Sequence, residues 1–254
     1  MSEATSAEFD TVAAWTADVA VDLGPEFFVP AGCRGSGSPA ALRWLVERLE
    51  LGRSQRLLDA GAGVGGPAAF AAEEAGVRPV LVEPEQGACR AARRLFAFPV
   101  VQADAAALPF PADHFDVAWC LGVLCTSQDQ PGLVRELRRV LRDGARLGLL
   151  VFTASVPAVT GAPDGNDFPT PDALRRLLRD SDLQVEAMTP ADASGPPPAD
   201  WSRRADAVEA ELERRHADDD AWRTAQRQSA AFGRLLASGQ VAGTLVVARA
   251  GRTG

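Results

Sequence analysis

The sequence LLDAGAGVGG, residues 57–66, decides the fold class of this 254-residue chain. An apolar run enters a cluster of glycines, and a helical pattern follows from Gly66, which is the order strand, glycine loop, helix. Glycine allows a tight turn and lets the backbone approach a ligand closely, because no Cβ stands in the way. The segment therefore predicts a ligand-binding loop at the end of a buried strand.

Strand and helix patterns alternate after this loop. Alternation at this spacing is typical of right-handed βαβ units and of a parallel sheet that helices cover on both faces. We therefore expect an α/β fold with a doubly wound sheet. The apolar runs that predict its strands are residues 56–60, 79–83, 100–102, 115–121, 146–153, 183–188 and 244–249.

Helical patterns interrupt or precede the sheet pattern at two places. Residues 1–52 carry two of them and are expected to form an N-terminal helical cap, and residues 190–242 carry two more. Residues 53–189 and 243–254 are then the α/β domain, and residues 190–242 are a helical cap inserted between its last two strands. Parallel strands end at the edge of the sheet where ligands bind, so this insertion is expected to cover the ligand crevice.

The composition restricts the possible functions. The formal net charge is −8, and acidic residues are interspersed with the 26 basic ones, which argues against nucleic acid as a partner. The chain has no Lys, Tyr or Ile and a single Asn, a pattern that we interpret as the signature of a high-GC bacterial genome. Catalysis by a Lys amine or a Tyr phenol is thereby excluded. Four cysteines without a CxxC pair, together with two histidines, give no metal-ligand spacing, so no metal is expected.

The first residues, MSEATSAEFD, lack the basic and apolar regions of a signal peptide. The longest apolar run, residues 147–152, is too short to cross a bilayer. We therefore expect a cytoplasmic protein without a membrane partner. The sequence gives no prediction of its oligomeric state.

The glycine loop fits two classes of ligand. Gly61, Gly63 and Gly66 satisfy the GxGxxG pattern of dinucleotide-binding proteins, and an acidic residue about 20 positions on, Glu83, suits a ribose. Gly61, Gly63 and Gly65 equally satisfy an acidic-xGxGxG pattern with Asp59 at its start. A carboxylate at the loop entrance suits the cationic amino group of a methionine moiety better than a pyrophosphate.

Further motifs follow in order: VEPE at 82–85, ADAAALPFPADHFDVA at 103–118, CLGVL at 120–124 and LVRELRRVLRDGARLGLLVF at 133–152. With these motifs, residues 57–152 resemble the class I S-adenosylmethionine-dependent methyltransferases, of the bacterial small-molecule group. The resemblance implies a Rossmann-like seven-stranded sheet with the strand order 3-2-1-4-5-7-6 and S-adenosylmethionine as the cofactor.

The resemblance also assigns cofactor contacts. It implies that Glu83 binds the ribose hydroxyls, that Asp104 binds the adenine amino group and that the glycine loop lines the methionine end. The residues placed at the cofactor in this way are Asp59, Gly61, Gly63, Gly65, Glu83, Pro84, Asp104, Ala105, Leu121 and Gly122.

Substrate and catalytic residues are harder to predict. Aromatic side chains near the rim are candidates for lining an apolar substrate cavity, although each could equally belong to the core: Trp15, Phe28, Trp201 and Trp222. His216, the sole histidine of the inserted cap, is the candidate general base, with a solvated helix position as the alternative.

These observations predict methyl transfer to an O, N or C atom of a small, hydrophobic specialised metabolite. One alternative is an S-adenosylmethionine-binding protein of natural-product biosynthesis that is not a methyltransferase, such as a cyclase or an eliminase. Another is a non-catalytic binding protein.

Overall fold

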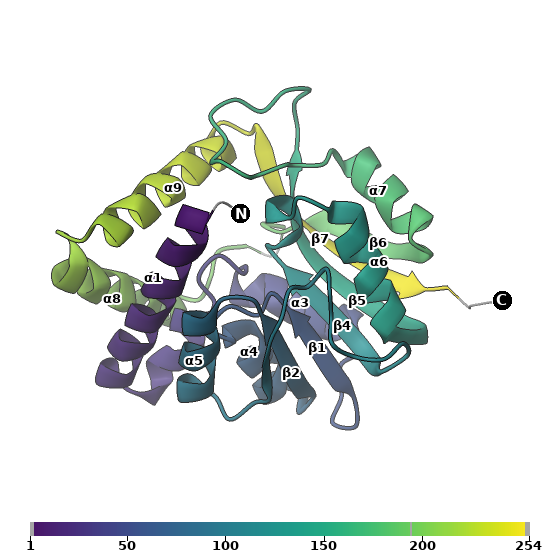
Figure 1. Ribbon diagram of the computed structural model, residues 1–254, viewed down its shortest axis with the longest axis horizontal. Helices are drawn as coiled ribbons and strands as arrows, with labels where there is room; N and C mark the ends of the chain where they lie inside the picture. The colour runs from purple at the N-terminus through teal and green to yellow at the C-terminus, as the bar shows by residue number, and fades with distance from the viewer. Residues whose placement is uncertain (1–2, 194, 252–254) are drawn as a thin grey trace.

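The central element of the structure is a seven-stranded sheet with the order β3-β2-β1-β4-β5-β7-β6 (Figure 1). The computed structural model describes residues 3–193 and 195–251, and the counts of strands and helices refer to these. Neighbouring strands from β3 to β5 are parallel, whereas β7 is antiparallel to both β5 and β6. The strands are β1 (Arg56–Ala60), β2 (Arg78–Glu83), β3 (Val100–Gln102), β4 (Phe115–Leu121), β5 (Leu141–Ala154), β6 (Leu183–Pro190) and β7 (Val241–Ala250).

This topology confirms the predicted fold class and strand order. Several strand boundaries differ by one to three residues, and the largest difference is in β5, which begins at Leu141 and not at Arg146. Leu141 pairs with Phe115 and Arg146 pairs with Val117, so the residues between them form an irregularity in the strand. Gly144, with φ of 76°, lies in this irregularity. The break in apolar alternation there makes the early part of the strand invisible in the sequence pattern.

Helices cover both faces of the sheet. Side chains of α6 and α7, such as Leu137 and Leu178, pack with Leu58 of β1 in one buried cluster. Leu45 of α3 and Phe70 of α4 pack in a second buried cluster on the other face. The helices are α1 (Glu3–Leu23), α2 (Phe28–Gly32), α3 (Pro39–Arg48), α4 (Gly66–Ala75), α5 (Gln86–Leu95), α6 (Gln130–Val140), α7 (Pro171–Asp180), α8 (Ala199–His216) and α9 (Asp220–Ala237), with short 3₁₀ turns at Pro25–Phe27 and Leu124–Thr126.

Several helix starts follow directly from the sequence. The Ser38 hydroxyl accepts a hydrogen bond from the amide of Ala41 at the start of α3, over 3.2 Å. Thr170 caps α7 and Asp129 caps α6 in the same way. Each of these caps precedes a proline in the first helical turn, where the missing N–H has no intrahelical partner to lose.

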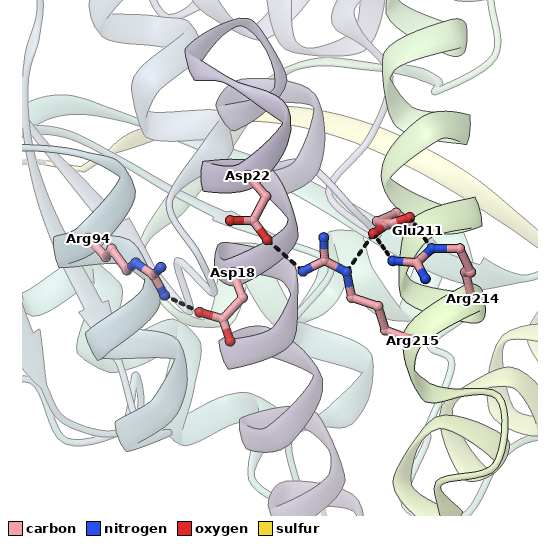
Figure 2. Close-up of polar contacts among 6 residues, drawn as sticks. All are labelled: Asp18, Asp22, Arg94, Glu211, Arg214 and Arg215. Atoms are coloured by element: carbon pink, nitrogen blue, oxygen red, sulfur yellow. Dashed lines mark hydrogen bonds and ion pairs between the residues drawn. The ribbon is translucent and has the colours of Figure 1, made fainter.

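The helices α8 and α9 lie between β6 and β7 in the chain and pack against α1 (Figure 1). Trp222 of α9 and Leu212 of α8 are buried in a cluster with Val12 and Val19 of α1. An ion pair adds to this contact, with Arg215 of α8 and Asp22 of α1 2.7 Å apart (Figure 2). Among the described residues, no helix is long and apolar enough to span a membrane.

Candidate functional site

A cavity of about 320 Å³ lies at the carboxyl ends of β1, β2 and β4. Parallel sheets bind ligands at this edge, and the volume is at the lower end of the range typical of small-molecule sites. Its walls come from α1, the segment between α2 and α3, the glycine loop, the end of β2 and the turn after β4. The lining residues are Phe9, Val12, Ala13, Thr16, Ala31, Gly32, Arg34, Gly35, Ser36, Gly61, Ala62, Gly63, Val64, Glu83, Pro84, Leu121, Gly122, Val123 and Thr126.

The glycine loop packs so closely against the turn after β4 that Gly61 cannot carry a side chain without a clash. Gly61 has φ of 74°, a backbone conformation that favours glycine. A Cβ at this position would lie 2.3 Å from the Cγ2 atom of Val123, which lines the cavity. The amides of Gly61 and Ala62 both donate to the carbonyl of Val82, over 2.8 and 3.0 Å, and so anchor the loop to β2.

Glu83 is the carboxylate of the cavity wall and is 4% exposed. Its Oε2 accepts from the amide of Gly63 over 2.8 Å, and its Oε1 accepts from the amide of Glu85 over 3.1 Å. Burial raises the pKa of Glu83 to about 7, and the two backbone amides act in the opposite direction. Each carboxylate oxygen keeps further acceptor capacity, so Glu83 can also accept hydrogen bonds from a diol.

Asp59 is buried behind the loop and does not line the cavity. It lies opposite Trp119 in the sheet register. Its Oδ2 and the indole Nε1 of Trp119 are buried without a hydrogen-bond partner among the described residues. Burial raises the pKa of Asp59 to about 7, and the nearby charge of Glu83 adds to this rise. The neighbouring indole of Trp119, which lies outside hydrogen-bonding geometry, lowers the pKa of Asp59.

The structure brings six of the ten predicted cofactor residues to the cavity wall: Gly61, Gly63, Glu83, Pro84, Leu121 and Gly122. The other four lie outside it. Gly65 is the residue that precedes α4, and a Cβ there would lie 2.7 Å from the Cδ2 atom of Leu81. Ala105 is buried, and the exposed Asp104 accepts from the amide of Ala106 over 2.8 Å just beyond the end of β3. A contact of Asp59, Gly65, Asp104 or Ala105 with the cofactor stays a prediction.

None of the predicted substrate and catalytic residues is among the lining residues of this cavity. Trp15 of α1 stacks on His216 of α8, with ring centroids 3.8 Å apart. Phe28 packs edge-on against Phe96, and Trp201 packs edge-on against Phe70. Trp222 is buried and donates its indole N–H to Glu213. All five side chains hold helices together, and a role in substrate binding or catalysis stays a prediction.

Sequence reasoning missed two walls of the cavity. One is a face of α1, where Phe9, Val12, Ala13 and Thr16 recur at helical spacing. That periodicity was visible in the sequence, but it does not tell which neighbour the face contacts. The other is residues 31–36, where no sequence signal distinguishes Arg34 from the other 25 arginines.

Comparisons with known proteins agree with the fold. Residues 58–149 match the family described as a methyltransferase domain. The methyltransferase GfsG of Streptomyces halstedii is 32% identical over 41% of this chain and 40% of its own length. The 27-O-demethylrifamycin SV methyltransferase of Amycolatopsis mediterranei is 36% identical over 46% of this chain and 45% of its own length. The match thus spans less than half the length of these two relatives.

Among solved structures, the [4+2]-cyclase SpnF superimposes with a TM-score of 0.66 at 21% identity, over 84% of this chain and 81% of that one. The strand order, the glycine loop after β1 and the acidic end of β2 define the class I Rossmann-like methyltransferase fold. Together these findings support a class I S-adenosylmethionine-dependent methyltransferase.

The residues of the cavity fit S-adenosylmethionine, the cofactor of this family. Glu83 offers carboxylate acceptors to a ribose, and Gly61 lets the loop pack closely against Val123 in the cavity wall. The wall next to them is apolar at Val64 and Leu121, which suits an adenine ring and an aliphatic chain. These residues therefore fit this molecule.

Proposed function

We propose that this protein transfers the methyl group of S-adenosylmethionine to an O, N or C atom of a small, hydrophobic specialised metabolite. The observation that carries the proposal is the cavity at the carboxyl edge of the sheet, where Glu83 and the glycine loop stand beside apolar side chains of α1. The bound cofactor supplies an activated methyl group for in-line displacement at carbon.

The chain's own contribution is binding, orientation and the exclusion of water. The helix α1 and residues 31–36 form walls of the cavity next to the glycine loop, and we expect them to limit the access of water to the bound molecules. Effective molarities of well-oriented reactions are large enough for such positioning to supply most of the rate. Among the described lining residues, Glu83 is the single carboxylate and there is no histidine. The described lining therefore offers no separate general base to take a proton from the acceptor atom of the substrate.

An apolar small molecule fits this environment best. The lining includes Phe9, Val12 and Val123, and the hydroxyls of Thr16 and Thr126 give it a few polar groups. The relative from Amycolatopsis is named for methylation of a rifamycin, which supports a specialised metabolite as the class of substrate.

The test is a product assay. The purified protein is incubated with S-adenosylmethionine and a panel of apolar alcohols, amines and phenols. The proposal expects S-adenosylhomocysteine and a product heavier by one CH₂ unit, in equal amounts. At S-adenosylmethionine concentrations well below its Kd, Glu83→Ala should lower both signals about 10- to 100-fold. Arg142→Ala, at an exposed position on the opposite edge of the sheet, is the control and should keep them.

A second function stays open, in which the cofactor is bound but not consumed and the protein catalyses a cyclisation or an elimination. The absence of a base among the described lining residues favours it, because a cavity of this kind can act through shape and charge alone. An isomerised or eliminated product without S-adenosylhomocysteine in the same assay would identify this function and reject methyl transfer.

A further inference from the structure

Thr126 is a hydroxyl side chain of the cavity wall whose proton is already used. It ends the short 3₁₀ turn Leu124–Thr126, which follows β4. Its amide and its hydroxyl both donate to the carbonyl of Val123, over 2.9 and 2.8 Å. No described residue donates a hydrogen bond to its Oγ1 atom. Because a hydroxyl has one proton and two acceptor lone pairs, Thr126 can meet a ligand only as an acceptor.

The turn that carries Thr126 is fixed on both sides. Val123 packs closely against the glycine loop, since a Cβ at Gly61 would lie 2.3 Å from its Cγ2 atom. On the other side, the carbonyl of Cys125 accepts from the amide of Asp167 over 2.8 Å. The acceptor oxygen of Thr126 is therefore held in place relative to the glycine loop, as a group that orients a reacting atom must be.

The other two hydroxyls among the described lining residues behave differently. Thr16 donates to the carbonyl of Val12 over 2.8 Å, accepts a long hydrogen bond from Arg34 and is only 2% exposed. The Ser36 hydroxyl has no hydrogen-bond partner among the described residues, so it can donate as well as accept. Thr126 is thus the lining hydroxyl that selects for a ligand with a donor.

The ionisable side chains of the described lining are Glu83 and Arg34. Glu83 accepts from two backbone amides and is the expected acceptor for the ribose, and a guanidinium has no acceptor site for a proton. Neither group is free to take a proton from an attacking atom. An alcohol or a carbon acid must lose a proton to attack well, whereas a neutral amine attacks with its own lone pair.

We propose that the substrate is an amine with at least one N–H, and that Thr126 orients this amine by accepting a hydrogen bond from it. This inference rests on the proposed function and names its acceptor atom. An alcohol offers the donor but needs a base. A tertiary amine needs no base but offers no donor, so an amine with an N–H is the group that suits both features of the wall.

The transfer balances without a base in the wall. One N–H donates to the Oγ1 atom of Thr126, and the nitrogen lone pair stays free to form the new N–CH₃ bond. The C–S bond breaks and its electron pair remains on sulfur. The nitrogen then carries the positive charge, and the ammonium product gives its extra proton to water after release.

The test compares acceptors that share a carbon skeleton. Octylamine, N-methyloctylamine, N,N-dimethyloctylamine and 1-octanol form one set, and benzylamine with its N-methyl, N,N-dimethyl and alcohol counterparts forms a second. The products are identified by mass and compared with the amount of S-adenosylhomocysteine. The expected result is methyl transfer to the primary and secondary amines, and none to the tertiary amines or the alcohols.

Variants of Thr126 test its part in this selection. Thr126→Val keeps the shape and removes the acceptor, so kcat/KM for the amine should fall about 10-fold, whereas Thr126→Ser should retain most of it. Thr160→Val is the matched control, because it removes an exposed hydroxyl that donates to Gln240 away from the cavity lining. The affinity for S-adenosylhomocysteine and the melting temperature should stay the same in all three variants.

The pH profile checks that the amine reacts in its neutral form. With increasing pH, kcat/KM should reach half its maximum earlier for benzylamine than for octylamine, because benzylamine is the weaker base. Any contribution of Glu83 is common to both amines. The same half-maximal pH for the two would contradict the inference, since a group of the protein would then control the reaction.

The inference is overturned if an alcohol or a tertiary amine is methylated as fast as the primary amine, and the proposed function then stands. It also fails alone if Thr126→Ser loses as much activity as Thr126→Val. A loss of affinity for S-adenosylhomocysteine in Thr126→Val would equally reject it, because the acceptor would then serve the cofactor. If no member of either set is methylated, or if S-adenosylhomocysteine does not bind at all, the proposed function fails together with the inference.

Discussion

Replacing Asp59 by Asn should stabilise the folded protein at alkaline pH. The carboxyl is 1% exposed, and burial raises its pKa from 3.8 to about 7. Each pKa unit corresponds to about 1.4 kcal/mol, so the ionised Asp59 destabilises the folded state by about 4 kcal/mol above pH 7. Asn has nearly the same shape and carries no charge, so it removes this penalty.

The sign of the pH dependence follows from the raised pKa. Below pH 4, Asp59 is protonated in the folded and the unfolded chain, and no penalty arises. Between pH 4 and pH 7 the unfolded chain loses this proton while the folded chain keeps it, so the free energy of unfolding falls as the pH rises. The pKa of Glu83 is also raised, so Glu83 contributes a similar pH dependence to the free energy of unfolding. Because the unmodified protein and Asp59→Asn both contain Glu83, this contribution largely cancels when the two are compared.

The measurement is urea unfolding of the unmodified protein and of Asp59→Asn at pH 5 and pH 8. The advantage of the variant should grow by about 2 to 3 kcal/mol between these values. Asp164→Asn, at an exposed carboxyl, is the control and should show no such growth. A difference for Asp59→Asn that does not depend on pH would refute the reasoning that this carboxyl is buried without compensation.

Other changes have distinct expected outcomes. Gly61→Ala should weaken the binding of S-adenosylhomocysteine at least tenfold in calorimetry, because the new Cβ would clash with Val123. Gly144→Ala is the control: it has a similar φ of 76° and no atom within 4 Å of the new Cβ, so it should only lower the free energy of unfolding by about 1–2 kcal/mol. Equal binding by both variants would contradict the view that the close packing of Gly61 against Val123 shapes the binding site. His216→Ala should lower kcat by less than about a hundredfold, because its ring stacks on Trp15 and does not line the cavity; a larger loss with intact folding would make His216 a general base.

The strands could be predicted because each contains a short apolar run between turn signals, whereas the strand order was implied by the resemblance to the class I methyltransferases. The run Leu57–Ala60, with the glycines after it, was enough to place the loop, and Ser38 and Thr170 fixed two helix starts. Strand patterns, glycine loops and helix caps depend on residues close together in the sequence. They can therefore be recognised before the fold is known.

The remaining walls of the cavity depend on contacts between distant parts of the chain. The sequence predicts that residues 190–242 cover the ligand edge, and this stays a prediction. In the structure, Leu212 and Trp222 pack with α1, whereas Leu235 packs with Phe168 and Val241. The helix α1 is thereby held with Phe9 and Val12 at the cavity. Trp222, one of the aromatic residues predicted to bind the substrate, is buried in the contact with α1, and its role in substrate binding stays a prediction. Sequence pattern shows that a residue is buried, but it does not show which neighbour buries it.

The most direct test of the central claim is a calorimetric titration of the protein with S-adenosylmethionine and, separately, with NAD. The account predicts micromolar affinity for S-adenosylmethionine, about −8 kcal/mol, and no binding of NAD. It also predicts that Glu83→Ala weakens the affinity for S-adenosylmethionine about 10- to 100-fold, because the buried carboxylate is the acceptor for the ribose. Tight binding of NAD without binding of S-adenosylmethionine would contradict the account.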